Sequence, residues 1–487
     1  MFDKIKQLSK ETVIYGISNI VGRFFNFILV PFYSNVFARG DFGEFSLVYA
    51  YLSFLNVAFI YGMDASFMKY TSVSVGEEKK TTFSTAWLTV LITSTFFCLL
   101  LLGYHDSLRE VFKLDLQYNN IVFYVILILF LDTIALIPFA DLRLENKPVK
   151  FALIKTGNIL INLSLNIILI LGYGYGIEAI FISNLAASLF SILMLTPEII
   201  KKLQLKISKP ALRRLLKFAL PYLPGSLAAM FVQVIDVPII EMLAGKETLG
   251  LYRANYKLGI FIMLFVSMFN YAWQPFFLNN AKEKNAKEIF SKVFTLFLIV
   301  LSLVWVVLTL FTEDIAKIEF HSGMYILGEN YHEGLIIIPI ILLAYVFYGM
   351  YSIFTAGIYI QEKTKYFPIV TGAGAVINVI ANFILVPQIG IMGGAIATLM
   401  SYVVMAAGLY YFSQKCYRID YEYAKVGKLI ALILIVIVSY YYLHYIGILN
   451  LTIKFLILFG FLSSFIVLKI ISFSELKPLL KKLNIKR

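Results

Sequence analysis

Basic side chains stand inside stretches of sequence that are otherwise apolar. Arg23 lies about eleven residues into the first of these stretches, Lys155 lies in the fifth, and Arg253 and Lys257 lie one helical turn apart in the eighth. A charge near the centre of a lipid bilayer costs about 2.5–3.5 kcal/mol on insertion scales, so such a residue usually faces protein or water and serves a function. Arginine and lysine in a water-poor cavity suit phosphate or pyrophosphate. These positions therefore predict a site for an anionic group.

Amide and tyrosine side chains recur at helical spacing around two of these cations. One set shares a face of the first stretch, and a second set shares a face of the fifth. The first set is Tyr15, Asn19, Arg23, Asn26 and Tyr33, and the second is Lys155, Asn158, Asn162 and Asn166. Such side chains suit sugar hydroxyls, which favours a substrate with an anionic, sugar-bearing head. The alternatives are a seam of hydrogen bonds between helices and, for Lys155 and Arg253, an ammonium or guanidinium that reaches the headgroups.

Two acids lie in the same kind of sequence, Asp132 in the fourth stretch and Asp236 in the seventh. Either acid could pair with a cation or take up H⁺ or Na⁺ as a coupling ion. Asp132 lies at mid-span and is the better coupling candidate. Asp236 stands beside Pro238, so a structural turn is an equal alternative there.

The elements that carry these residues are predicted to be membrane-spanning helices. The 487 residues are 60% hydrophobic and 15% charged, with a mean hydropathy of +0.82. The apolar residues form blocks of about 20, the length that crosses about 30 Å of hydrocarbon as an α-helix. We count fourteen blocks: 12–37, 43–63, 82–103, 119–140, 149–171, 176–197, 212–235, 249–278, 289–311, 334–360, 366–386, 391–413, 426–446 and 450–471. The sequence therefore predicts an all-α membrane protein with no room for a soluble catalytic domain.

The net charge of +13 follows the positive-inside rule. With the N-terminus in the cytoplasm, the predicted inside segments and adjoining helix ends hold 32 of the 42 Lys and Arg residues. The predicted outside loops hold Arg39, Arg109, Lys113, Lys246 and Lys317. This distribution accounts for the basic balance without a nucleic-acid partner, and it predicts that both termini are cytoplasmic. Lys454 lies close to an outer helix end, where we expect it to reach the headgroups.

The chain contains a faint internal repeat. A shift of 207 positions aligns Val30-Pro31 with Val237-Pro238 and Gly43 with Gly250, and a shift of 216 aligns Asn162 with Asn378 and Asn166 with Asn382. The repeat predicts an N-lobe of helices 1–6 (1–200), a C-lobe of helices 7–12 (201–418), and two further helices with a basic tail (419–487). Because each copy has six helices, the copies are parallel, and parallel two-lobe transporters bind substrate between the lobes.

Other classes of site find no support in the sequence. There is no GxxxxGK[ST] motif for an ATPase motor, and the four histidines lack metal-ligand spacing. Cys98 and Cys416 imply no disulfide framework. We expect neither a cofactor nor a metal, and no enzymatic activity.

Several short motifs resemble the bacterial polysaccharide-export flippases of the Wzx type, in the superfamily that also holds MurJ and the MATE exporters. They are Phe42-Gly-Glu-Phe-Ser-Leu47, Tyr61-Gly-Met-Asp-Ala-Ser-Phe-Met-Lys-Tyr70, Leu142-Arg-Leu-Glu-Asn146, Gly250-Leu-Tyr252 with Tyr256-Lys257, and Ala272-Trp-Gln-Pro-Phe276. The resemblance implies two six-helix lobes around a cationic cavity, with basic residues at Arg23, Arg253 and Lys257. It also implies a role for Lys69 at the cytoplasmic mouth, where the family often has Arg.

The function that this resemblance implies is movement of an undecaprenyl-pyrophosphate-linked oligosaccharide across a bacterial cytoplasmic membrane. The unit would belong to an O-antigen, capsule or exopolysaccharide, and the protein would work beside a polymerase and glycosyltransferases. We expect a monomer among membrane lipids. The alternatives are a flippase for a lipid II-type peptidoglycan precursor, a cation-coupled multidrug exporter, and a membrane-embedded polymerase or ligase. The last normally needs a larger outside loop than the one near 312–333.

Overall fold

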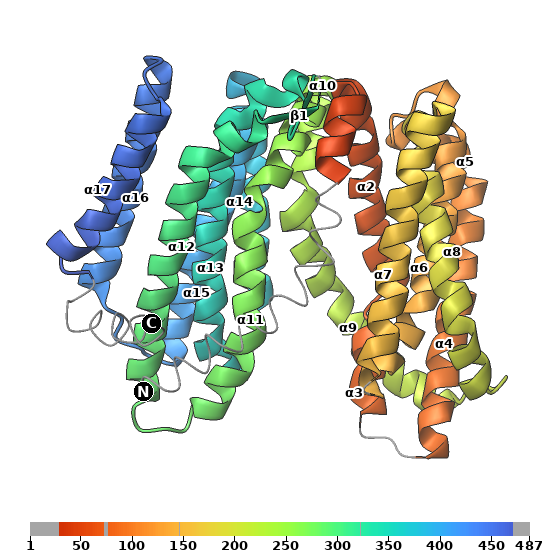
Figure 1. Ribbon diagram of the computed structural model, residues 1–487. Helices are drawn as coiled ribbons and strands as arrows, with labels where there is room; N and C mark the ends of the chain where they lie inside the picture. Colours follow the sequence, from red (N-terminus) through yellow and green to blue (C-terminus); the bar gives the residue numbers. More distant parts are fainter. Residues whose placement is uncertain (1–28, 73–75, 146, 322, 471–487) are drawn as a thin grey trace, which may run out of the picture. The chain divides into compact units, whose positions relative to one another are not determined.

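The computed structural model describes residues 29–72, 76–145, 147–321 and 323–470, and almost all of them lie in helices (Figure 1). Twelve helical segments in these residues are long and apolar enough to cross a membrane, and α17 adds a shorter apolar helix. The prediction of an all-α, multi-pass membrane protein is confirmed. The count of fourteen helices stays a prediction, because most of the first block, 12–37, lies outside the described residues.

The described residues pack into two units. Unit A consists of the described residues from 29 to 254 together with 378–391, and unit B consists of 255–377 and 392–470. The predicted N-lobe ends at residue 200, so unit A also takes in the segment 201–254, which the repeat assigns to the second copy.

Unit A begins with a helical segment at 29–36 and contains most of the chain up to the middle of α10. Its elements are α2 (Arg39–Ile60), α3 (Met63–Thr71), α4 (Glu77–Gly103), α5 (His105–Val111), η1 (Leu116–Tyr118), α6 (Asn120–Leu144), α7 (Pro148–Ile167), η2 (Ile168–Gly172), α8 (Glu178–Lys202), α9 (Lys209–Val234) and the first part of α10 (Asp236–Gly259). Helices α4, α6, α7 and α8 lie side by side, with α8 packed on both α6 and α7 (Figure 1).

Unit B is a second helical bundle with one small hairpin. Its elements are the end of α10, α11 (Phe261–Asn280), α12 (Ala286–Ala316), β1 (Glu319–His321), β2 (Met324–Tyr325), η3 (Glu329–Ile337), α13 (Ile338–Ile360), α14 (Tyr366–Ile389) as far as residue 377, α15 (Ile391–Cys416), α16 (Tyr423–Tyr445) and α17 (Leu451–Val467). Helix α13 packs on α11 and α12, and α16 and α17 also pack on α12. The antiparallel strands β1 and β2 lie in the loop that the sequence analysis gives as the longest outside loop.

Two left-handed glycines interrupt helices at positions that the hydropathy pattern does not mark. The predicted second helix ends at Ile60, because Tyr61 (φ 37°) and Gly62 (φ 77°) are left-handed and turn the chain into α3. Gly245 (φ 82°) breaks α10 in the same way. The left-handed region suits glycine, which has no Cβ. Residues 63–70 of the motif Tyr61–Tyr70 therefore lie on a separate short helix, α3.

The two C-terminal helices are held to α12 by polar contacts as well as apolar ones. The Lys454 ammonium lies 2.7 Å from the Asp314 carboxylate, and the Lys454 side chain is only 3% exposed. The expectation that Lys454 reaches the headgroups is therefore wrong. Its acidic partner lies 140 residues earlier in the chain, which hydropathy alone does not reveal.

Candidate functional site

The predicted site residues fall into several groups in the structure. Arg23, Asn19 and Asn26 lie outside the described residues, so their part in the site stays a prediction. Lys69, Lys155 and Asn162 lie in unit A, as do both candidate coupling acids. Arg253 and Lys257 lie on α10, at the boundary between the units.

Asp236 begins α10 and is almost completely buried, at 3% exposure. The Tyr252 hydroxyl donates a hydrogen bond of 2.7 Å to Asp236 Oδ2, and the charge of Arg253 acts on the same carboxylate. Arg253 and Lys257 are partly buried, one helical turn apart. The break at Gly245 allows the chain to turn back, so that Asp236 meets residues of the second half of its own helix. The arrangement pairs a buried acid with one of the predicted cations.

Asp132 on α6 forms the corresponding arrangement among the bundled helices of unit A. The Ser188 hydroxyl of α8 donates to Asp132 Oδ1 at 2.6 Å, and Lys155 on α7 interacts with Asp132 electrostatically. The Lys155 ammonium lies 4.1 Å from the centre of the Phe139 ring, and the side chain is exposed. A cation over a ring keeps its charge and its donors. Lys155 can therefore bind an anion while it remains tied to Asp132.

The amide stripe on α7 serves hydrogen bonds between and within helices. The Tyr33 hydroxyl donates to Asn166 Oδ1 at 2.8 Å, and Asn166 Nδ2 donates to the Asn162 carbonyl oxygen at 2.8 Å. Asn158 donates to the Ala187 carbonyl oxygen on α8 at 2.7 Å. These contacts fit the alternative of a packing seam for Tyr33, Asn158 and Asn166. Asn162 is only partly buried and has a neighbour in Asn166.

The same amide pair recurs at the positions that the repeat predicts. Asn382 Nδ2 donates to the Asn378 carbonyl oxygen at 2.9 Å and to Asn378 Oδ1 at 2.9 Å. The corresponding distances from Asn166 to Asn162 are 2.8 and 3.2 Å. This agreement in detail is what an internal repeat requires.

Lys69 lies near the end of α3, exposed, with its ammonium 4.1 Å from the centre of the Phe218 ring on α9. Arg214 lies over the neighbouring Tyr70 ring at 5.0 Å and pairs with Glu78 at 3.1 Å. Two cations and two rings thus gather where α3 packs on α9. Because ring contacts leave the ammonium donors of Lys69 in place, this cluster can attract an anion.

A cluster of seven charged residues joins the ends of α4, α6, α7 and α8, on the predicted cytoplasmic side. We call it the inner-end cluster; its members are Lys79, Asp141, Glu145, Lys147, Lys150, Glu198 and Lys202. Lys202 pairs with buried Asp141 and, at 2.6 Å, with Glu145. Burial alone would raise the pKa of Glu145, but hydrogen bonds from Lys147 and Lys202 outweigh it and lower that pKa to about 2.

A second cluster joins α2, the segment after α5 and α10, on the predicted outer side. We call it the outer-end cluster; its charged members are Glu44, Lys113, Asp115, Glu241 and Lys246. The Lys246 ammonium lies 3.2 Å from Glu44 and 3.2 Å from Asp115, and Lys113 pairs with Glu241. The Glu44 side chain is 3% exposed. Neither cluster was predicted from the sequence, although the members of each lie in or beside segments on the same predicted side of the membrane.

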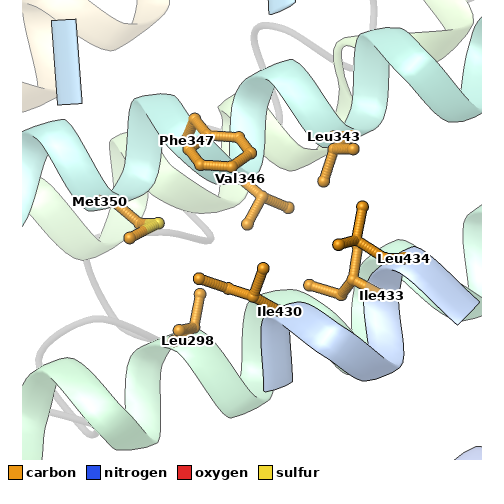
Figure 2. A pocket seen from close by; sticks show the side chains of 8 residues that line it. All are labelled: Leu298, Leu343, Val346, Phe347, Met350, Ile430, Ile433 and Leu434. Carbon is orange, nitrogen blue, oxygen red and sulfur yellow. The ribbon is translucent and has the colours of Figure 1, made fainter. Parts of the chain in front are cut away.

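Unit B contains a small apolar pocket between α12, α13 and α16. Figure 2 shows its eight lining side chains, which are hydrocarbon apart from one methionine sulfur. They are Leu298, Leu343, Val346, Phe347, Met350, Ile430, Ile433 and Leu434. Such a lining offers nothing to a charged or sugar-bearing head.

Comparisons with known proteins agree with the membrane architecture. A family model described as "Polysaccharide biosynthesis protein" matches residues 36–279. No curated protein was found to match the chain. Among solved structures, the chain is similar to the lipid II flippase MurJ in an inward closed conformation, at 17% identity and a TM-score of 0.72, over 93% of this chain and 98% of that chain.

Two transporters of the MOP superfamily are also similar. An inward-facing multidrug resistance MATE family transporter aligns at 14% identity and a TM-score of 0.68, over 81% of this chain and 94% of that chain. A transporter from Pyrococcus furiosus, described as having a binding pocket of reverse polarity, aligns at 13% identity and a TM-score of 0.59, over 85% and 95%. At these identities the likeness establishes the fold, which is that of MurJ and the MATE transporters.

Proposed function

Because this chain belongs to the polysaccharide biosynthesis protein family, we propose that it is a flippase for an undecaprenyl-pyrophosphate-linked oligosaccharide. The unit, from an O-antigen, capsule or exopolysaccharide, would move from the inner to the outer leaflet of the bacterial cytoplasmic membrane by alternating access. Family and fold are those of transporters, and the motifs that resemble the polysaccharide branch lie largely within the matched residues 36–279.

The observation that carries the proposal is the pair of basic residues on α10. Arg253 and Lys257 are partly buried at or beside a segment long and apolar enough to span the membrane. A pyrophosphate offers a doubly anionic partner that offsets the cost of such charges, whereas a drug cation would be repelled by them. Arg23, Lys155 and Lys69 would contribute further positive charge along the path, and Asn19, Asn26 and Asn162 would meet sugar hydroxyls.

In the proposed mechanism, uptake of a coupling ion supplies the energy for directional transport. Asp132 and Asp236 each have a hydroxyl donor and a cationic neighbour, so the charge state of the acid and the position of the cation are linked. Uptake of H⁺ or Na⁺ at either acid would free the neighbouring cation for substrate. Asp132 is the first candidate because its partner Lys155 is exposed.

The test removes single cations and measures export of polymer. We expect Lys257→Ala and Arg23→Ala to leave membrane insertion unchanged and to abolish export, with lipid-linked repeat units accumulating on the cytoplasmic side. Lys282→Ala, which removes an exposed lysine between α11 and α12, is the matched control and should export normally. Full export by both cavity variants would overturn the proposal. Lysis with accumulation of lipid II in cells that lack the protein would instead indicate a peptidoglycan-precursor flippase.

A further inference from the structure

The backbones of α2 and α10 approach each other closely at two glycines. A Cβ added to Gly43 would lie 2.0 Å from the Lys246 carbonyl oxygen, and a Cβ added to Gly250 would lie 1.8 Å from the Arg39 carbonyl oxygen. The same Cβ positions lie 3.0 and 2.9 Å from the backbone nitrogen of the other glycine. Side chains cannot enter this crossing, because small residues are what lets two helix backbones touch.

The two contacts are equivalent under the internal repeat. The shift of 207 positions that aligns Gly43 with Gly250 also aligns Arg39 with Lys246. Gly43 therefore meets the counterpart of Arg39, while Gly250 meets Arg39 itself. Reciprocal contacts of this kind, with two equivalent residues touching each other, occur only on a two-fold axis. At this crossing the two contacting segments are therefore related by a local two-fold axis, as a parallel repeat predicts.

A contact on this axis has a mechanical consequence for a parallel two-lobe transporter. The path between the copies follows the axis, and alternating access requires the copies to part at each end in turn. We propose, on the basis of the proposed transport function, that the Gly43–Gly250 crossing closes one end of this path and must separate in every cycle. The predicted topology assigns this end to the outer side of the membrane.

An ion pair flanks the crossing. The buried Glu44 carboxylate, next to Gly43, accepts from the Lys246 ammonium and from the Asp115 backbone N–H, the latter at 3.2 Å. Charged groups can exchange such partners for water when the crossing opens, whereas buried apolar surface cannot. The contact between the copies also extends beyond the crossing. Residues 236–254 pack with unit A, although the repeat assigns them to the second copy.

The test uses a cysteine as a reporter of opening. Ser46 lies three residues beyond Gly43 on the same face of α2 and is 5% exposed, so Ser46→Cys changes one atom at a buried position. The background carries Cys98→Ser and Cys416→Ser, and a membrane-impermeant maleimide is applied from outside. Gly43→Ala and Gly250→Ala should raise the rate of labelling at least fivefold, because the added Cβ meets backbone that cannot close around it.

Two further variants keep the result interpretable. Gly40→Ala is the matched control on α2, because its Cβ would meet only the Glu247 side chain, at 3.9 Å. Glu44→Gln keeps the size of the side chain and weakens only the ion pair with Lys246. It should therefore also raise the rate of labelling, even where an alanine variant fails to insert. Unchanged labelling in inserted Gly250→Ala and Glu44→Gln protein would overturn the proposal. Labelling does not involve the sugar. Increased labelling without a loss of polymer export would contradict the proposed substrate, and a loss of export without increased labelling would contradict the proposed gate.

Discussion

The outer-end and inner-end clusters are built from the same chemistry but join different parts of the chain. Each buries a carboxylate, Glu44 at one end and Asp141 at the other, against a lysine. The outer-end cluster connects α2 to α10, which the repeat assigns to different copies. The inner-end cluster connects α4, α6, α7 and α8, all from the first copy. On the proposed mechanism, ion pairs within one copy keep its shape, while ion pairs between copies are made and broken during transport.

The strongest test of this comparison is to fix each end by a covalent link. Cysteines at Asp115 and Lys246, joined by a short bifunctional maleimide, would tie the two copies together at the outer end. We expect at least a tenfold loss of polymer export on cross-linking, because the copies can no longer part there. Cysteines at Lys150 and Glu198 would tie α7 to α8 within the first copy, and export should stay within twofold.

Both pairs are read out as export before and after cross-linking of the same protein, so any effect of the substitutions themselves cancels. Normal export with the outer end fully cross-linked would contradict the distinction between the two clusters. So would a complete block by the inner-end link.

A second, smaller effect concerns stability, and here the inner end should dominate. Asp141→Ala leaves the Lys202 ammonium at 11% exposure without its most buried partner. Breaking a buried ion pair costs about 3–5 kcal/mol when the remaining charge has no other partner. The contact of Lys202 with Glu145 makes this an upper bound. We expect the thermal unfolding midpoint of purified protein in detergent to fall clearly for Asp141→Ala. It should hardly change for Asp420→Ala, whose partner Arg418 is 80% exposed. Equal midpoints for the two variants would remove the structural role of the inner-end cluster.

Much of the fold could be predicted from the sequence, because spanning helices depend on local composition. The predicted block 119–140 corresponds to α6 and 391–413 lies within α15, since runs of apolar residues leave few other structures available in a membrane. The prediction was poorer where backbone conformation decides. Hydropathy does not report the left-handed Gly62 or Gly245, so the predicted block 43–63 runs past the end of α2, and residues 236–244 were not predicted to be helical.

The sequence indicates candidate residues for a site but does not indicate their partners. The periodicity of α7 correctly placed Asn158, Asn162 and Asn166 on a polar face, yet it could not say that Asn158 and Asn166 are occupied by hydrogen bonds. The partners of Asp132 come from α7 and α8, and their choice depends on how three helices pack. Lys454 illustrates the same limit, because depth in a helix does not reveal an acid on another helix.

The smallest predicted effect is the loss of stability when acid protonates Glu145 in the inner-end cluster. The pKa of Glu145 is lowered from an ordinary 4.5 to about 2 in the folded protein. Near pH 4.5 the Glu145 carboxylate therefore takes up a proton in the unfolded chain but stays ionised in the folded protein. The stabilisation by its charge is complete above pH 4.5 and is lost as the pH falls towards 2. Glu145→Gln removes the charge at every pH and should cost about 1–3 kcal/mol at pH 7.

Acidification should consequently bring the two proteins together. The unfolding midpoint of Glu145→Gln should lie below that of the unaltered protein at pH 7, and the gap should narrow steadily between pH 4.5 and pH 3. Glu288→Gln is the control, because Glu288 pairs with Lys292 while 62% exposed, and exposed pairs contribute about 0–1 kcal/mol. A gap that stays constant with pH would mean that Glu145 stabilises the protein through hydrogen bonds that glutamine cannot copy, and not through its charge. Export should remain near normal throughout at pH 7, since an ion pair within one copy has no need to break when the copies part.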